Sequence, residues 1–297
     1  MKKVIIYGHK FGSHTHSSIH LGFYRAFTYL GFETFWFDDN DDLRSFDLSD
    51  CIFLTEGQVM SKMPIRKDCT YFLHNCPPIE GTGKKINFQY YQKDCEKMEH
   101  ISHGIAIQDD CVYFSWGANM LPDEFDERDI TSKRNKSIYY IGTVHPKGEN
   151  GNYEYLNDFA MAAFYKGYTT YFGGGYSGKY ENKYFNYLSG WISEESQEII
   201  LKTCWASPAV QGHNQLINGM IPCRLFKSIS YGLDGLTTNP FAYKFFNNEV
   251  VYADNGMDLF EEAERRQNEI ERKRYLFNFV KSNHTYLNNI NALMQMI

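Results

Sequence analysis

The stretch KVIIYGHKFGSHTHSSIHLGFYRAFTYLGFETFWF, residues 3–37, decides the fold class. It begins with an apolar run at Lys3–Tyr7 and ends with a second apolar run at Thr34–Phe37. Between them, apolar side chains recur at helical spacing over Ser18–Leu30, and Gly31 follows as a C-cap. A strand, a helix and a strand in this order form a βαβ unit, which implies a parallel sheet with helices on both faces.

The same alternation continues along the chain and then restarts. Further short apolar runs predict strands at Cys51–Leu54, Thr70–Leu73 and Gly104–Ile107. Residues 115–137 are rich in charge and have little apolar content after Phe125, which is typical of a linker. A new strand, SIYYIG, follows directly. We therefore predict one α/β domain over residues 1–125 and a second over residues 126–297.

Composition excludes several classes of protein. The 297-residue chain has a formal net charge of −6, which argues against a nucleic-acid partner. Its seven cysteines are an odd number without a C-x-x-C pair, as expected for reduced thiols in a cytosolic compartment. No apolar stretch approaches the roughly 18 residues of a membrane span. We expect a cytoplasmic protein, for which a peripheral membrane contact stays open.

The loop after the first predicted strand, GHKFGSHTHSSIH at residues 8–20, is a candidate site. Its glycines permit a tight turn, and the start of the next helix offers free N–H groups to an anion or a sugar hydroxyl. His14 and His16 are candidate general bases, because the pKa of imidazole lies near neutrality; surface or helix-capping roles are the alternative. We expect no metal there, since no cysteine or carboxylate is near in sequence.

A third candidate base is His74 in FLHNCPP, residues 72–78. It follows an apolar strand, and the two prolines block any helical continuation. A histidine at the carboxyl end of a strand is placed for acid–base chemistry or for orienting a substrate hydroxyl. The alternative is a polar strand end satisfied by the backbone.

Two stretches of the second domain have the residues to bind phosphate. In YYIGTVHPKG, residues 139–148, the predicted strand ends at Gly142 and Thr143, and Lys147 follows. Small residues let backbone N–H groups approach a phosphate, and the lysine neutralises it. In IPCRLFKSISYG, residues 221–232, Arg224 and Lys227 share one helical face near the amino end of the helix. A guanidinium forms paired hydrogen bonds with phosphate; a solvated surface pair is the alternative.

Five segments, in this order, resemble GT-B-fold glycosyltransferases of the group 1 type, in which two Rossmann-like domains face each other across a cleft. They are FSWGANMLPDEFD (114–126), IYYIGTVHPKG (138–148), YLSGWISEESQEIILKTCWASPAV (187–210), IPCRLFKSISYGLDGLTTN (221–239) and VKSNHTYLNNINALM (280–294). The last two are similar to the spore-maturation-protein-like branch. The resemblance covers residues 115–297 and reaches the first domain in pattern only.

The resemblance implies a hexosyl- or pentosyltransferase that moves a sugar from a nucleotide-diphosphate sugar to a glycan or other hydroxyl acceptor. It implies no cofactor and no bound metal. The first domain would lie on the acceptor side and the second would bind the donor. By position, the diphosphate of the donor would be bordered by Gly142, Thr143, Lys147 and Arg224. The nucleotide base would be bordered by Trp191 and Ile192.

Lys227 departs from the pattern, because the family has a glutamate there that usually holds donor hydroxyls. An ammonium group only donates hydrogen bonds. Either Lys227 joins Arg224 on the phosphate, or the ribose is held differently. An inverting reaction would need one of the three histidines as base, and a retaining reaction would not. Two alternatives stay open: a nucleotide-sugar epimerase of the same fold, and a sugar or nucleotide sensor without turnover.

Overall fold

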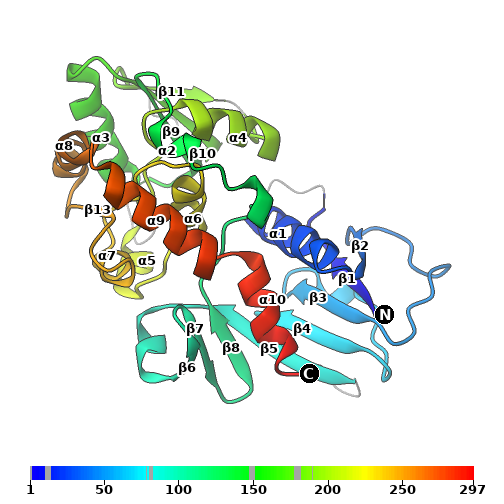
Figure 1. The fold of residues 1–297 in the computed structure, drawn as a ribbon. Helices are drawn as coiled ribbons and strands as arrows, with labels where there is room; N and C mark the ends of the chain where they lie inside the picture. The colour runs from blue at the N-terminus through cyan, green and yellow to red at the C-terminus, as the bar shows by residue number, and fades with distance from the viewer. Residues whose placement is uncertain are drawn as a thin grey trace. The chain divides into compact units, whose positions relative to one another are not determined.

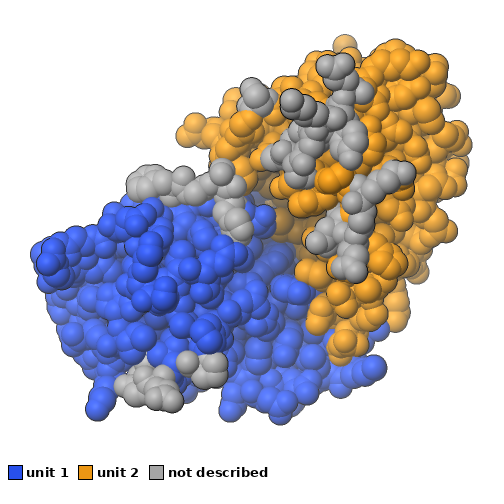
Figure 2. Space-filling model, turned by 180° about the vertical axis from the view of Figure 1, so that it is seen from behind, with its two compact units in different colours: residues 1–91, 95–121, 283–297 blue, residues 92–94, 122–282 orange. Residues whose placement is uncertain are grey.

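The computed structural model describes residues 2–10, 15–77, 79, 83–146, 151–176, 182–188 and 190–297. The chain divides into two compact units, which Figure 2 shows in different colours. The first unit comprises Met1–Tyr91, Cys95–Leu121 and Asn283–Ile297, and the second comprises Gln92–Asp94 and Pro122–Ser282.

An eight-stranded sheet in the order β2-β1-β3-β4-β5-β8-β7-β6 forms the first unit (Figure 1). Pairing is parallel from β2 to β8, and antiparallel in the β8-β7 and β7-β6 pairs. The strands are β1 (Lys3–Tyr7), β2 (Glu33–Phe37), β3 (Ile52–Glu56), β4 (Thr70–His74), β5 (Lys84–Tyr90), β6 (Glu99–Ser102), β7 (Ile105–Gln108) and β8 (Cys111–Phe114). Short 3-10 turns lie at η1 (Met60–Lys62) and η2 (Lys93–Lys97), the second of which begins in the other unit.

Helix α1 (Thr15–Tyr29) joins the parallel strands β1 and β2, which confirms the predicted βαβ unit. It begins three residues earlier than the apolar spacing indicates. Its apolar face is buried, and the ring of Phe23 lies 5.8 Å from that of Phe88 on β5 and 6.0 Å from that of Phe114 on β8. Helix and sheet therefore share one aromatic core.

The C-terminal helix α10 (Tyr286–Met294) belongs to the first unit and packs on α1 (Figure 1). The ring of Tyr286 lies 4.9 Å from that of Phe23. The sequence analysis places a boundary between residues 125 and 126 and assigns the whole tail to the second domain. The structure has the break after Leu121 and returns Asn283–Ile297 to the first unit. Helix α10 packs against α1, which lies far away in the sequence. Local sequence patterns therefore do not indicate to which unit α10 belongs.

The second unit contains a three-stranded parallel sheet in the order β11-β10-β9 and a two-stranded parallel sheet of β12 and β13. The strands are β9 (Ser137–Val144), β10 (Thr169–Tyr176), β11 (Phe185–Leu188), β12 (Leu236–Thr237) and β13 (Val251–Tyr252). One buried cluster joins the two sheets, since it includes Tyr140 and Phe172 together with Leu236 and Val251.

Helices flank these sheets along the whole unit (Figure 1). They are α2 (Arg128–Thr131), α3 (Tyr153–Tyr165), α4 (Glu194–Thr203), α5 (His213–Ile217), α6 (Cys223–Ser230), α7 (Pro240–Phe245), α8 (Gly256–Arg266) and α9 (Ile270–Asn283), with a 3-10 turn η3 at Pro122–Glu124. Rings of Phe159 on α3 and Phe260 on α8 meet at 5.5 Å. Within the described parts of the chain, no helix is both long and apolar enough to cross a membrane.

Candidate functional site

Arg224 lies in the first turn of α6 and packs against the carboxyl-terminal half of β9. Its guanidinium carbon lies 4.6 Å from the centre of the Tyr140 ring. A Cβ added to Gly142 would lie 2.8 Å from Nη1 of Arg224, so the absence of a side chain at Gly142 makes room for the guanidinium. Sequence analysis nominated Gly142 and Arg224 separately, and the structure brings them together.

The Nη1 atom of Arg224 is buried and has no hydrogen-bond partner among the described residues. Leaving a buried donor without a partner costs about 1–3 kcal/mol, and more when the group is charged. Pro222, the N-cap of α6, makes no side-chain cap hydrogen bond to the first turn. The unpartnered Nη1 and the uncapped helix start both favour an anionic ligand.

Internal hydrogen bonds fix the end of β9. The carbonyl of Thr143 accepts hydrogen bonds from the Tyr140 hydroxyl and from Nδ2 of Asn152, both at 3.2 Å. The backbone N–H of His145 donates to Oδ1 of Asn152 at 2.9 Å. Thr143 itself is exposed. Lys147, the fourth predicted phosphate contact, lies outside the described residues.

Lys227, one turn beyond Arg224, is held by helix α4. Its ammonium donates to Oε2 of Glu194 at 2.5 Å and to Oε1 of Gln197 at 2.7 Å. The lysine side chain is 15% exposed and that of Glu194 is 29% exposed. Two of the three N–H bonds of the ammonium are thus used within the protein. The sequence did not show this ion pair, because its members lie on different helices.

The two residues predicted to contact the nucleotide base, Trp191 and Ile192, lie just before α4. Trp191 is 43% exposed, which leaves much of its ring open to a ligand. The Cδ1 atom of Ile192 lies over Gly173 on β10, where an added Cβ would approach it to 2.5 Å. The carbonyl of Ile192 accepts from Nε2 of Gln197 at 2.7 Å, so Gln197 links this segment to Lys227. The carboxyl edge of the three-stranded sheet is therefore formed in part by Gly142, Gly173 and Ile192. Open α/β sheets bind ligands at this edge.

In the first unit, His16 and His74 are neighbours, with ring centres 5.4 Å apart. Histidine 74 is the last residue of β4 and is 3% exposed. Its Nδ1 donates to the Phe88 carbonyl at 3.1 Å, and the side-chain amide of Asn75 lies 3.0 Å from its Nε2. Burial lowers the pKa of His74 below its ordinary value, which favours the neutral ring at pH 7. His14 lies outside the described residues.

Sequence analysis missed Glu56, and it included His9 in the candidate loop at residues 8–20 without assigning it a role. Glu56 ends β3 and is 2% exposed, and its Oε1 lies 2.5 Å from Nε2 of His9. The ring centres of His9 and His16 are 5.5 Å apart. The signal was present, because Glu56 lies two residues after the predicted strand Cys51–Leu54, and His74 directly follows the predicted strand Thr70–Leu73. Inspecting every polar residue at a strand's carboxyl end would have found it.

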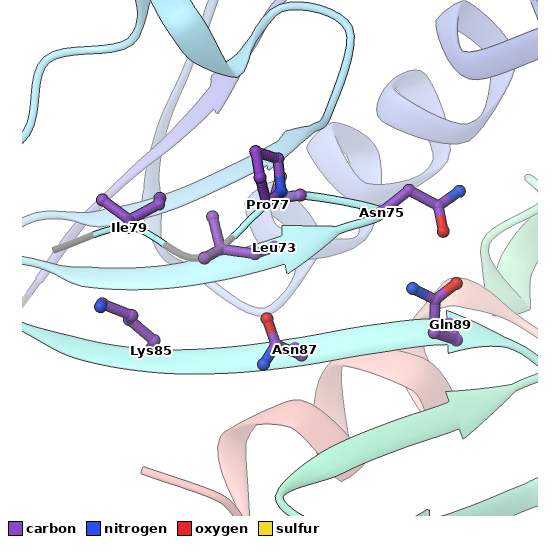
Figure 3. A pocket seen from close by; sticks show the side chains of 8 residues that line it. Leu73, Asn75, Pro77, Ile79, Lys85, Asn87 and Gln89 are labelled. Carbon is purple, nitrogen blue, oxygen red and sulfur yellow. The ribbon is translucent and has the colours of Figure 1, made fainter.

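A pocket of about 260 Å³ lies along β4 and β5 in the first unit, and the residues on either side of His74 in the sequence, Leu73 and Asn75, line it (Figure 3). Leu73 of β4, the loop after β4 and alternate residues of β5 line it: Leu73, Asn75, Cys76, Pro77, Ile79, Lys85, Asn87 and Gln89. The amide groups of Asn75, Asn87 and Gln89 lie along its edge (Figure 3). Amides both donate and accept hydrogen bonds, as sugar hydroxyls do, which suits this pocket to a polar ligand.

Comparisons with known proteins bear on the fold. No protein-family model and no curated protein matches the sequence. An "alpha-glucosyltransferase (AGT) in complex with UDP" is matched with a TM-score of 0.65 and 10% identity, over 100% of this chain and 99% of that one. The chain has the GT-B fold.

Two further solved structures agree with this assignment. AviGT4, a glycosyltransferase involved in avilamycin A biosynthesis, is matched with a TM-score of 0.56 and 13% identity, over 99% of this chain and 98% of that one. Trehalose-6-phosphate synthase, OtsA, is matched with a TM-score of 0.55 and 11% identity over the full length of both chains. The predicted GT-B fold class is therefore confirmed. The spore-maturation-like branch stays a prediction.

Proposed function

We propose that the protein is a glycosyltransferase that moves a sugar from a nucleotide-diphosphate sugar to a hydroxyl acceptor. The observation that carries the proposal is the guanidinium of Arg224, which is fixed on Tyr140 and Gly142 with a buried N–H group that lacks a partner among the described residues. A diphosphate supplies the acceptor oxygens that this donor lacks. The matched AGT structure contains UDP, which supports a nucleoside diphosphate as the ligand.

The second unit would hold the donor. Arg224 would form paired hydrogen bonds with the diphosphate, and backbone groups at Gly142 and Thr143, with the charge of Lys147, would complete the phosphate site. The exposed ring of Trp191, with Ile192 beside it, would border the base. The third N–H of Lys227 would reach a phosphate oxygen, a secondary contact because Glu194 and Gln197 already hold the ammonium.

In this site the cationic side chains would stabilise the departing diphosphate during the chemical step. Negative charge grows on the diphosphate as the sugar departs, and fixed positive groups stabilise it without reorganisation. We therefore propose that transfer itself proceeds without a bound metal ion. The ribose would be held by groups other than Lys227, because an ammonium cannot accept hydrogen bonds from hydroxyls.

The first unit would bind the acceptor. We assign His16 as the general base of an inverting reaction, since the lowered pKa of His74 makes it a weaker base and its Nε2 already faces the amide of Asn75. His74 would then orient a substrate hydroxyl, and His14 stays a further candidate. The amide-lined pocket, whose lining residue Asn75 contacts His74, suits a glycan. In a retaining reaction no base is needed, and His16 and His74 would position the acceptor.

We propose a glycan acceptor rather than nucleic acid. One matched structure is an alpha-glucosyltransferase in complex with UDP and a 13-mer DNA containing an HMU base, at a TM-score of 0.64. The net charge of −6 of this chain disfavours a polyanionic partner. A place in the spore-maturation-like branch, in the cytoplasm and with peripheral membrane contact, is part of the proposal and rests on the sequence patterns alone.

Product analysis tests the function. The protein is incubated with uridine and guanosine diphosphate sugars, with and without a mixture of oligosaccharide acceptors. The masses of the products are then measured by mass spectrometry. We expect one donor to release its nucleoside diphosphate and one acceptor to gain the mass of one sugar. An epimerase would change the donor without changing its mass, and a sensor would change neither; either result overturns the proposal.

A further inference from the structure

Two histidines and a buried carboxylate meet at one edge of the eight-stranded sheet. Oε1 of Glu56 lies 2.5 Å from Nε2 of His9, and Oε2 of Glu56 lies 3.9 Å from Nδ1 of His16. One nitrogen or oxygen atom from each of the three residues lies within 4.8 Å of the others. The side chains of His9 and His16 are only 11% and 15% exposed. The three groups therefore converge on one small, largely enclosed volume.

The fold dictates this convergence. Strands β1 and β3 pair in parallel with Ile6 opposite Leu54, so the residues that follow each strand leave the sheet side by side. His9 follows β1 with a left-handed φ of 58°, which turns the chain away from the sheet. Nδ1 of His20 donates to the carbonyl of Gly8 at 2.9 Å and thereby anchors the backbone next to His9. These contacts position two of the ligand-bearing residues before any ligand binds.

A carboxylate removed from water needs a positive partner. Two imidazole nitrogens and one carboxylate are a common ligand set of Zn²⁺ and of other first-row divalent metals, with bonds of about 2.0–2.2 Å. Two ligands of one such ion are at most about 4 Å apart, so atoms within 4.8 Å of one another need only a small side-chain adjustment.

We propose that His9, His16 and Glu56 bind a divalent transition metal, with Zn²⁺ as the best match. The ligand atoms are Nε2 of His9, Nδ1 of His16 and a carboxylate oxygen of Glu56. Three protein ligands leave the fourth position of a tetrahedral zinc ion open to water or to a ligand. His20, through its bond to the Gly8 carbonyl, supports the site from outside, as groups around metal ligands commonly do.

The metal would also change what His16 can do. A neutral imidazole bound through Nδ1 carries its proton on Nε2 and cannot accept another. Zinc occupancy and general-base catalysis by His16 therefore exclude one another, so the metal would inhibit transfer rather than assist it. This consequence rests on the proposed function, whereas binding of the metal does not.

Calorimetry on the full chain tests the site. The protein is freed of metal by dialysis against a chelator and then against chelator-free buffer, and zinc chloride is titrated into it. We expect saturable binding of one zinc ion per chain. Cobalt(II) serves as a second probe, because its visible absorption changes in position and intensity when protein ligands replace water around the ion.

Variants identify the ligands. His9→Asn retains a residue that tolerates the left-handed backbone, and Glu56→Gln keeps the size of the side chain. Each should weaken zinc binding at least about tenfold and remove the cobalt absorption. The exposed histidines 100 and 213, replaced by alanine, are the matched controls and should leave both signals unchanged.

Melting curves show whether each variant folds; if Glu56→Gln does not, His9→Asn and His16→Ala decide. Zinc binding of wild-type strength in these folded variants, or no binding to the wild type, overturns the proposal. Zinc binding without sugar transfer would leave the metal site standing and would contradict only the proposed function.

Discussion

The guanidinium carbon of Arg224 lies 4.6 Å from the centre of the Tyr140 ring, and Gly142 leaves the space that the guanidinium fills. An arginine held on an aromatic face is already ordered before its ligand arrives. The conformational cost of binding is correspondingly smaller. Arg224 at the start of α6 is thus held against the end of β9. The proposed phosphate site of the second unit is therefore preformed.

Gly142→Ala tests the contact from the strand side. The added Cβ would lie 2.8 Å from Nη1 and 3.0 Å from Cζ of Arg224, so the guanidinium must move while the fold persists. We expect nucleoside diphosphate affinity to fall about tenfold, or ~1.4 kcal/mol, with little change in melting temperature. Thr143→Ala is the control, since Thr143 is proposed to act through its backbone. Unchanged affinity in Gly142→Ala would refute the contact as a binding determinant.

Lys227→Met separates the two roles of that lysine. The substitution removes hydrogen bonds to Glu194 and Gln197, and we expect it to lower the free energy of unfolding by roughly 1–2 kcal/mol. Diphosphate affinity should fall less than in an Arg224 variant. Urea denaturation and calorimetry measure the two effects, with Glu194→Gln as the partner in a double-mutant cycle. If Lys227→Met lost as much diphosphate affinity as an Arg224 variant, at unchanged stability, Lys227 would be a primary phosphate contact.

Histidine variants test the assignment of the base. A general base contributes typically 10²–10⁴-fold, so we expect His16→Ala to lower kcat by about two orders of magnitude or more, with donor affinity nearly unchanged. His74→Ala should affect kcat less and stability more, because its ring is buried. His14→Ala completes the series. If all three keep near-normal turnover, none of these three histidines is the base, and NMR of the anomeric product decides whether the reaction retains configuration.

His284 couples stability to pH. Burial lowers its pKa from 6.5 to about 3, and Nδ1 lies 3.0 Å from Oγ of Ser115. The unfolded chain takes up a proton below about pH 6.5 that the folded chain excludes. The free energy of unfolding therefore falls as the pH drops from 6.5 toward 3, by up to ~1.4 kcal/mol per pH unit from this group.

Denaturation at several pH values between 7 and 5 measures this effect. His284→Asn should flatten the pH dependence relative to wild type, and His213→Asn, at an exposed histidine, controls for the loss of one imidazole. Equal slopes in wild type and His284→Asn would show that His284 does not contribute.

Local periodicity was enough to predict β1, α1 and β2, because the apolar residues of β1 and most of those of α1 are buried and those of β2 are half-buried. It failed at β5 (Lys84–Tyr90), where only Ile86 and Phe88 are fully buried and lysines and amides occupy the other side. The predicted strand at Gly104–Ile107 exists as β7, but it lies in an antiparallel arrangement with β6 and β8. Strand direction depends on long-range pairing, which single-sequence patterns do not contain.

The candidate site shows the same division. Residue chemistry nominated Arg224, Gly142, His16 and His74. Their contacts, the ion pair of Lys227 with Glu194 and the approach of Glu56 to His9 depend on elements far apart in the chain. Glu56 was overlooked because a single acidic residue after a strand is common, and only the fold places two histidines beside it.

Calorimetric titration of the wild type and Arg224→Met with UDP and GDP tests the central claim most directly. Methionine keeps a long side chain on Tyr140 and removes only the charged donors. We expect one of the two nucleotides to bind the wild type and to bind Arg224→Met with a free energy weaker by roughly 1.5–3 kcal/mol, at an unchanged melting temperature. Arg274→Met, which alters an arginine paired with Glu271 on α9, should bind like the wild type. Equal affinity of wild type and Arg224→Met for the nucleotide would contradict the claim that Arg224 holds the donor diphosphate.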